Sequence, residues 1–171
     1  MEYISSDTTV WIDFSVIDRT SLPFLLPYTY IMSSDAVHDE LLSPPDLGKE
    51  LLSLGLVPVE ITIEEFELAQ SYGAAYRRLS VHDRVALAIA KNRRIVLLTG
   101  DKALRKAAAS ESVSVMGTLG ILDQLWQQSR ITSLEYKDCL KELLSHNGGA
   151  VRLPLSEIQS RLDSIQIIAT E

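Results

Sequence analysis

The sequence predicts an α/β fold: a three-layer sandwich with a central parallel sheet of about five strands, plus C-terminal helices. Short apolar, β-rich runs alternate with helical patterns up to residue 131, and this alternation favours parallel strand pairing. From residue 132 onward only helical patterns occur. The 171-residue length is near that of one domain. We therefore expect an α/β domain over residues 1–131 and a helical extension over 132–171 that packs on the same domain.

The first half of the chain is expected to supply three strands. The run TVWIDFSVID (9–18) is apolar and β-rich, so it is predicted to be the buried first strand, ending near Asp13. Gly55 is typical of a helix end, and Pro58 favours an edge strand. The other expected elements are a Pro-limited turn of helix (21–27), a strand (28–34), a helix capped by Ser33 or Ser34 (35–42), a helix (43–55), a strand (56–62) and a helix (62–78).

The second half is expected to continue the alternation before the helical end. After its first turn, the segment 80–94 is apolar nearly all round, which indicates a helix packed on both sides. Ser80 and Asp83 at its start resemble a capping box. The remaining expected elements are a strand (95–100), a helix (101–110), a strand (113–117) and helices over 118–128, 133–149 and 153–165.

Composition limits the class of protein. Hydrophobic residues make up 46% and charged residues 23%, as in an ordinary globular protein. No apolar run approaches the roughly 20 residues that span a bilayer, and MEYISSDTT lacks the basic and apolar regions of a signal peptide. The single Cys139 excludes an intramolecular disulfide and a multi-cysteine zinc site. We expect a cytoplasmic protein with no membrane segment and a structural Cys139.

Charge is distributed unevenly along the chain. The net charge of −7 argues by itself against nucleic-acid binding. However, residues 77–106 carry nine basic and two acidic side chains, a local charge of +7, which leaves −14 on the remainder. A basic segment in an acidic protein is typical of a phosphate-facing patch. A solvated helix face with basic helix ends explains any single one of these residues equally well.

Four carboxylates are candidates for one site. Asp13 is expected at the end of the first strand and Asp101 just beyond the 95–100 strand, where ligands bind in open parallel sheets. Asp83 opens an apolar helix, and Glu40 is the acid on the apolar face of its helix. Each has an alternative explanation: helix capping for Asp83 and Asp101, a solvated helix surface for Glu40, and a distant buried partner for Asp13.

Four acids in one crevice would raise one another's pKa values unless a cation compensated their charge. A set of oxygen ligands without Cys or His favours Mg²⁺ or Mn²⁺ over Zn²⁺. Such an ion binds phosphate oxygens and lowers the pKa of a bound water, as phosphodiester hydrolysis requires. The basic surroundings of Asp83 and Asp101 therefore suggest that a metal and a nucleic-acid backbone meet there.

The order of these residues resembles the PIN-domain family of metal-dependent ribonucleases. The corresponding motifs are WIDFS with Asp13, VHDEL with Glu40, LSVHDRVALAIA with Asp83 and LLTGDKALRKAA with Asp101. The GTLG turn and the segment GGAVRLPLSEIQSRL are similar to a branch of small prokaryotic members. One position departs from the pattern: the family commonly has a hydroxyl or amide residue directly after the first Asp, and here Phe14 stands there, followed by Ser15.

The resemblance implies RNA cleavage by metal-activated water, with Asp13, Glu40, Asp83 and Asp101 as catalytic residues that bind Mg²⁺ or Mn²⁺. It also implies a homodimer and, in many members, the toxin role in a toxin–antitoxin pair. An Arg or Lys of an antitoxin protein would then occupy the metal position. The alternative is a non-enzymatic PIN-like module that binds RNA or protein through a degenerate metal site.

Two other α/β classes fit the sequence less well. A phosphoacceptor receiver domain would need an Asp ending its third strand and a Lys ending its fifth, and PVEIT and VSVMG provide neither. A dinucleotide-binding domain would need a glycine-rich turn after the first strand, and DFSVID contains no glycine.

Overall fold

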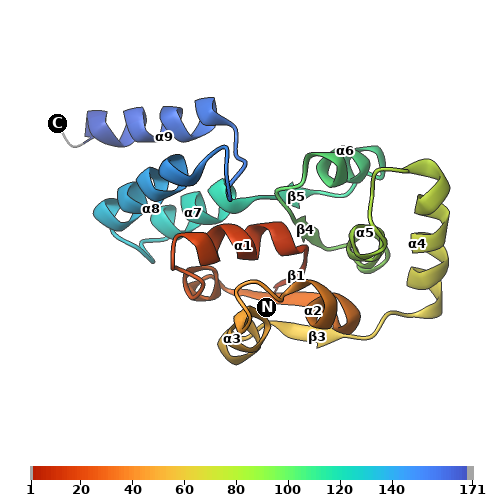
Figure 1. Cartoon of the computed structure of the whole chain (residues 1–171). Helices are drawn as coiled ribbons and strands as arrows, with labels where there is room; N and C mark the ends of the chain where they lie inside the picture. Colours follow the sequence, from red (N-terminus) through yellow and green to blue (C-terminus); the bar gives the residue numbers. More distant parts are fainter. Residues whose placement is uncertain (1, 169–171) are drawn as a thin grey trace.

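The computed structural model describes residues 2–168 and has five parallel strands in one sheet, in the order β3-β2-β1-β4-β5 (Figure 1). The strands are β1 (Glu2–Ser6), β2 (Tyr28–Ser33), β3 (Val57–Val59), β4 (Val96–Leu98) and β5 (Val115–Met116). The strand order reverses between β1 and β4. In open parallel sheets this is the switch point, where a crevice opens at the carboxyl ends of the strands.

Apart from α1, the helices that cover the sheet correspond closely to the helical patterns of the sequence. Ser33 caps α2 as expected, and Ser80 and Asp83 form both hydrogen bonds of a capping box on α5. Pro58 lies on the edge strand β3. The helical bounds are α1 (Thr8–Val16), η1 (Leu22–Leu25), α2 (Ser34–Glu40), α3 (Leu47–Leu54), α4 (Ile63–Ala75), α5 (Val81–Arg93), α6 (Lys102–Ser110), α7 (Thr118–Gln127), α8 (Ser133–His146) and α9 (Leu155–Ile168).

Two hydrophobic clusters on opposite faces of the sheet make the fold a three-layer sandwich. Successive residues of a strand point to opposite faces, and in β4 Leu98 joins one cluster while Leu97 joins the other. The Leu98 cluster includes residues of α1, α3, α7, α8 and α9, and the Leu97 cluster includes residues of α4, α5 and α6. The predicted α/β sandwich with a five-stranded parallel sheet and C-terminal helices is confirmed.

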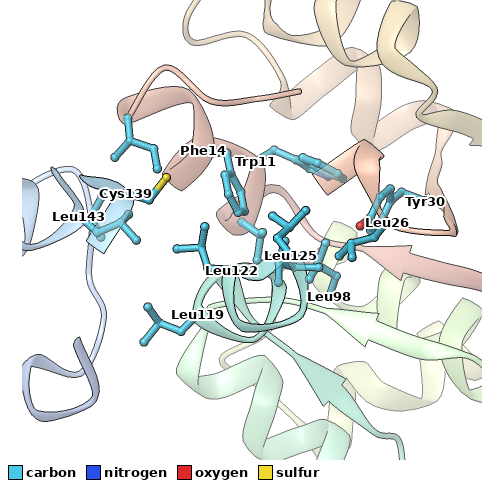
Figure 2. Packing of buried hydrophobic residues seen from close by; sticks show 14 of the residues in the cluster. Trp11, Phe14, Leu26, Tyr30, Leu98, Leu119, Leu122, Leu125, Cys139 and Leu143 are labelled. Carbon is cyan, nitrogen blue, oxygen red and sulfur yellow. The ribbon is translucent and has the colours of Figure 1, made fainter. Parts of the chain in front are cut away.

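The prediction of a first strand over residues 9–18 is wrong, because most of this run forms helix α1. Its buried apolar residues Val10, Phe14 and Ile17 recur at helical spacing, and Trp11 beside Val10 widens the same face. Trp11 stacks on Phe24 of η1, and Figure 2 shows Phe14 directed toward α7 and Trp11 toward Tyr30. A short apolar run does not by itself distinguish a strand from a buried helix. The true first strand is the preceding segment, Glu2–Ser6.

Residues of α8 and α9 pack on the same core as α1 and α7. The buried Cys139 lies beside Phe14 in this core, and burial raises the pKa of its thiol to about 12, which suits a structural role (Figure 2). Arg161 of α9 pairs with Asp123 of α7 at 2.8 Å. No helix in the described part of the chain has both the length and the apolar character needed to cross a bilayer.

Candidate active site

Asp7 directly follows β1 and is only 4% exposed, at the carboxyl end of the central strand. Its backbone N–H donates to the Leu98 carbonyl oxygen at 2.9 Å, so the β1–β4 ladder continues up to this residue. Its carboxylate accepts hydrogen bonds from the hydroxyl groups of Thr99 (2.8 Å) and Thr9 (3.1 Å). Asp7 is therefore held in one orientation at the switch point of the sheet.

Glu40 and Asp83 approach Asp7 from the neighbouring helices α2 and α5. Glu40 is the last residue of α2, and with Asp7 and His82 it lines a hollow of about 10 Å³, close to the space that one water molecule occupies. Asp83 lies in the first turn of α5, where its carboxylate accepts from the Ser80 backbone N–H at 3.0 Å. Asp83 thus caps its helix, and its carboxylate is near enough to Asp7 and Glu40 to raise the pKa of both.

Two of these carboxylates, Asp7 and Glu40, have raised pKa values. Burial raises the pKa of Asp7 above its ordinary value, and the nearby Asp83 carboxylate raises it further. Burial also raises the pKa of Glu40, and both Asp7 and Asp83 add to this effect, although His82 and the Thr8 hydroxyl oppose it. Because like charges raise each other's pKa values, such a group binds a cation more favourably than an isolated carboxylate does.

Asp101 is connected to Asp7 through Thr99, by its backbone N–H and not by its carboxylate. It caps α6, with its Oδ1 atom accepting from the Leu104 backbone N–H at 2.8 Å. Its own N–H donates to the Thr99 hydroxyl at 3.1 Å, and the same hydroxyl donates to Asp7. The structure therefore places Asp101 at the carboxyl end of β4, beside the Asp7 position, while it also serves as a helix cap.

Asp13 does not lie at a strand end, contrary to the sequence prediction. It belongs to α1, four residues after Thr9 and on the same face of the helix. It is 6% exposed, and its Oδ2 atom accepts a 2.7 Å hydrogen bond from the Thr118 hydroxyl at the start of α7. Burial, the main cause, raises its pKa from 3.8 to about 6. The Asp13 carboxylate thus connects the second turn of α1 to the start of α7.

Sequence reasoning missed Asp7, although a signal for it was present. Thr8 follows Asp7 directly, and its hydroxyl contacts Asp7 Oδ1 at 3.4 Å. The family pattern has a hydroxyl or amide residue directly after the first Asp. Thr8 meets this requirement after Asp7, whereas Phe14 does not meet it after Asp13. Phe14 is instead a fully buried core residue. Aligning the pattern on SSDTT in place of WIDFS removes the departure from the family motif.

The carboxylate oxygens of this region suit a hard divalent cation, but they do not form a complete set of protein ligands for one ion. Among residues 2–168, no group of three or more His, Cys, Asp or Glu side chains is arranged to hold one ion. Mg²⁺ commonly needs only one or two carboxylates, with waters and substrate phosphates completing its shell. Asp7 and Glu40, which line the same hollow, provide such a pair.

The basic residues of segment 77–106 fall into two groups. Arg93 pairs with the fully buried Glu65 at 2.8 Å, and Lys91 donates to the Glu111 carbonyl oxygen at 2.6 Å, so both are structural. Others are exposed and form no ion pair within the described part of the chain; on α6, which starts at Asp101, these are Lys102, Arg105 and Lys106. Only the second group is free to contact a phosphate.

Comparison with known proteins identifies the family of the chain. A family model described as a PIN domain matches residues 3–165, which is nearly the whole chain. No significant match was found among curated proteins or solved structures. The matched range runs from β1 into α9. This chain belongs to the PIN-domain family.

Proposed function

We propose that this protein is a metal-dependent endoribonuclease that hydrolyses RNA phosphodiester bonds, with Mg²⁺ or Mn²⁺ as its cofactor. One observation carries the proposal: Asp7 and Glu40 line one hollow at the switch point of the sheet, where burial and the nearby Asp83 carboxylate raise the pKa of both. A bound divalent cation would stabilise the ionised form of such buried, neighbouring carboxylates. Membership of the PIN-domain family, whose members are generally nucleases, supports the assignment.

The roles we propose follow from how each side chain is held. Asp7 and Glu40 bind the ion directly, since they share one hollow. Asp83 and Asp101 act through water molecules, because part of each carboxylate caps a helix. Thr99 and Thr9 orient Asp7 through their hydroxyl groups. The ion, when bound, would lower the pKa of a coordinated water and offset the charge of the phosphate.

We propose a different role for Asp13 from the one expected from sequence. Its carboxylate holds the Thr118 hydroxyl and thereby positions the start of α7. It lies against Gly100, between β4 and Asp101. Asp13 is then a positioning residue that acts through α7 and the Gly100 turn, and Asp7 takes the place of the first ligand.

Two matched variants test the assignment. We expect Asp7→Asn to abolish most Mn²⁺-dependent cleavage of single-stranded RNA, since Asn keeps the volume but loses the charge that binds the ion. In EDTA this variant should unfold at the same temperature as the parent or a higher one, because one acid of a mutually repelling set is removed. Asp13→Asn should keep measurable cleavage. Full activity in Asp7→Asn would overturn the proposal.

A binding measurement separates loss of metal from loss of chemistry. Calorimetric titration of Mn²⁺ into the parent should show binding that Asp7→Asn and Glu40→Gln remove and that Asp13→Asn retains. If the parent cleaves no RNA tried and binds no Mn²⁺, the protein is better described as a PIN-like binding module. If Asp13→Asn alone removes binding, Asp13 is the ligand and Asp7 is not.

We further propose a protein inhibitor, as expected for the toxin of a toxin–antitoxin pair. The acidic group of Asp7, Glu40 and Asp83 would attract an Arg or Lys side chain, which can occupy the cation position. Adding the product of a neighbouring gene in excess should suppress cleavage if that product is the antitoxin. Self-association as a homodimer is also proposed, and light scattering that shows a monomer at high concentration would contradict it.

A further inference from the structure

A second cavity shares the lining residue His82 with the hollow that contains Asp7 and Glu40. It has a volume of about 280 Å³ and is formed by residues of α2, α4 and α5 and by the segment that follows β3. This is just below the roughly 300 Å³ at which small-molecule sites begin, so the cavity has room for a single planar ring and not for a larger ligand. Ser33 and His82 line both the cavity and the hollow that contains Asp7 and Glu40. The two spaces therefore share a wall.

The cavity wall combines an aromatic face with hydrogen-bonding groups. Phe66 of α4 is 50% exposed, and Val81 of α5 is 65% exposed, so apolar surface faces the solvent here. Gln70 lines the cavity one turn after Phe66. Asp35 and Glu60 add carboxylates that form no ion pair within residues 2–168. An aromatic ring beside free acceptors matches the flat face and the amino edge of a nucleobase.

The charges around the cavity favour a base over a phosphate. Asp35 and Glu60 would repel a phosphate, whereas their oxygen atoms accept hydrogen bonds from exocyclic amino groups. Arg84 also lines the cavity and keeps its positive charge, but it is outnumbered by the two carboxylates Asp35 and Glu60, so the charged side chains of the wall are negative on balance. Uracil has no exocyclic amino group, so the same wall would hold it less well.

We propose that this cavity binds the base of a nucleotide adjoining the cleaved phosphodiester, with the ring stacked on Phe66. The inference rests on the proposed ribonuclease function, because the shared wall at His82 is what relates the base to the acidic group. The substrate is then a single strand, since a base must leave its pair and its stack to enter the cavity. Bases with an exocyclic amino group are preferred to uracil.

Binding is measured apart from cleavage, with short labelled oligonucleotides of C, A or U and the uncleaving full-length Asp7→Asn protein. Fluorescence anisotropy should show tighter binding of the C and A oligomers than of the U oligomer. Adding Phe66→Ala should weaken C and A binding by about tenfold, within the range that base–aromatic stacking gives. The matched control is Ile63→Ala, since Ile63 is 75% exposed on the same helix but lies outside the cavity wall.

Two further results complete the test. Phe66→Trp should retain binding, and its indole fluorescence should be quenched by C and A oligomers. Equal effects of Phe66→Ala and Ile63→Ala, or no preference among the oligomers, would overturn the proposal. So would a change in oligomeric state in both variants, which would identify the patch as a contact between copies of the chain. Because binding is measured without cleavage, the two proposals are tested independently. The base-binding proposal can fail while the ribonuclease assignment stands, and the ribonuclease assignment can fail while base binding is observed.

Discussion

The Thr99 hydroxyl donates a 2.8 Å hydrogen bond to the Asp7 carboxylate, although the two residues are 92 positions apart. Thr99 is fully buried and also accepts from the Asp101 backbone N–H at 3.1 Å. One side chain thus connects the carboxyl end of β1 to that of β4. It fixes Asp7 relative to Asp101 at the point where the strand order reverses.

Replacing Thr99 by Val should weaken metal binding and cleavage without removing either. The variant keeps the shape of the side chain but leaves Asp7 without its shortest hydrogen bond. Loss of a group that orients a metal ligand typically lowers metal affinity by about 10–100-fold. Mn²⁺ titration and single-turnover cleavage measure the effect, and Thr99→Ser, which keeps the hydroxyl, should restore most of both. Unchanged Mn²⁺ affinity in Thr99→Val would show that this hydroxyl does not support a ligand.

Asp13 should make the protein less stable as the pH rises. Burial raises its pKa from 3.8 to about 6, so the folded protein binds this proton more tightly than the unfolded chain does. The free energy of unfolding therefore falls between about pH 4 and pH 6, by up to about 3 kcal/mol from this group. Asp13→Asn removes the titration and keeps an acceptor for Thr118, so its stability should depend less on pH.

Urea unfolding of the parent and of Asp13→Asn at pH 4 and pH 7 measures this difference. Asp46→Asn is a suitable control, because Asp46 is exposed and its side chain does not cap α3. The same pH dependence in all three proteins would contradict the raised pKa of Asp13.

Exposed basic residues of α6 should contribute to RNA affinity through phosphate contacts. Lys102 and Arg105 follow Asp101 on α6, and the Arg105 guanidinium lies beside Gly117 at the GTLG turn. Each contact to a single strand adds about 0.7 to the slope of log K against log salt. Lys102→Gln and Arg105→Gln should each weaken binding of every oligonucleotide and reduce this slope.

The matched control for the α6 residues is Lys49→Gln, a change at an exposed lysine of α3 outside the basic segment. Binding to the Asp7→Asn protein should be measured between 50 and 200 mM salt, roughly the range over which such contacts are lost. An unchanged slope in both α6 variants would place the RNA backbone elsewhere.

The C-terminal helices should unfold together with the sheet, as we propose for residues 132–171. Ile158 of α9 is fully buried in the cluster that contains Trp11 and Phe14. Ile158→Ala should therefore destabilise the protein by about 2–5 kcal/mol, as for other large-to-small core substitutions. The exposed Leu155→Ala at the start of α9 should have little effect. Two separate thermal transitions in the parent would indicate an independently folding extension.

Sequence patterns predicted most of the fold because most elements carry strong local signals. Helix caps such as Ser33 and Ser80, the glycine at residue 55 and the proline of the edge strand all act within a few residues. The alternation of strand and helix patterns along the chain then predicted that the strands pair in parallel. The positions of Glu40, Asp83 and Asp101 follow from those local signals.

The position of the first strand was decided only by tertiary structure. The segment EYISS has only one large buried aliphatic residue, Ile4. Its two serines are also buried, because their hydroxyl groups form hydrogen bonds to residues that are distant in the sequence. Ser5 Oγ donates to the Ala86 carbonyl oxygen and Ser6 Oγ to that of Ile31, residues that lie 81 and 25 positions away. No local pattern reports such bonds. These hydrogen bonds form only when β1 lies between β2 and β4 with α5 packed beside it. They offset the free-energy cost of burying the serine hydroxyl groups. The same placement of β1 brings Asp7 to the switch point.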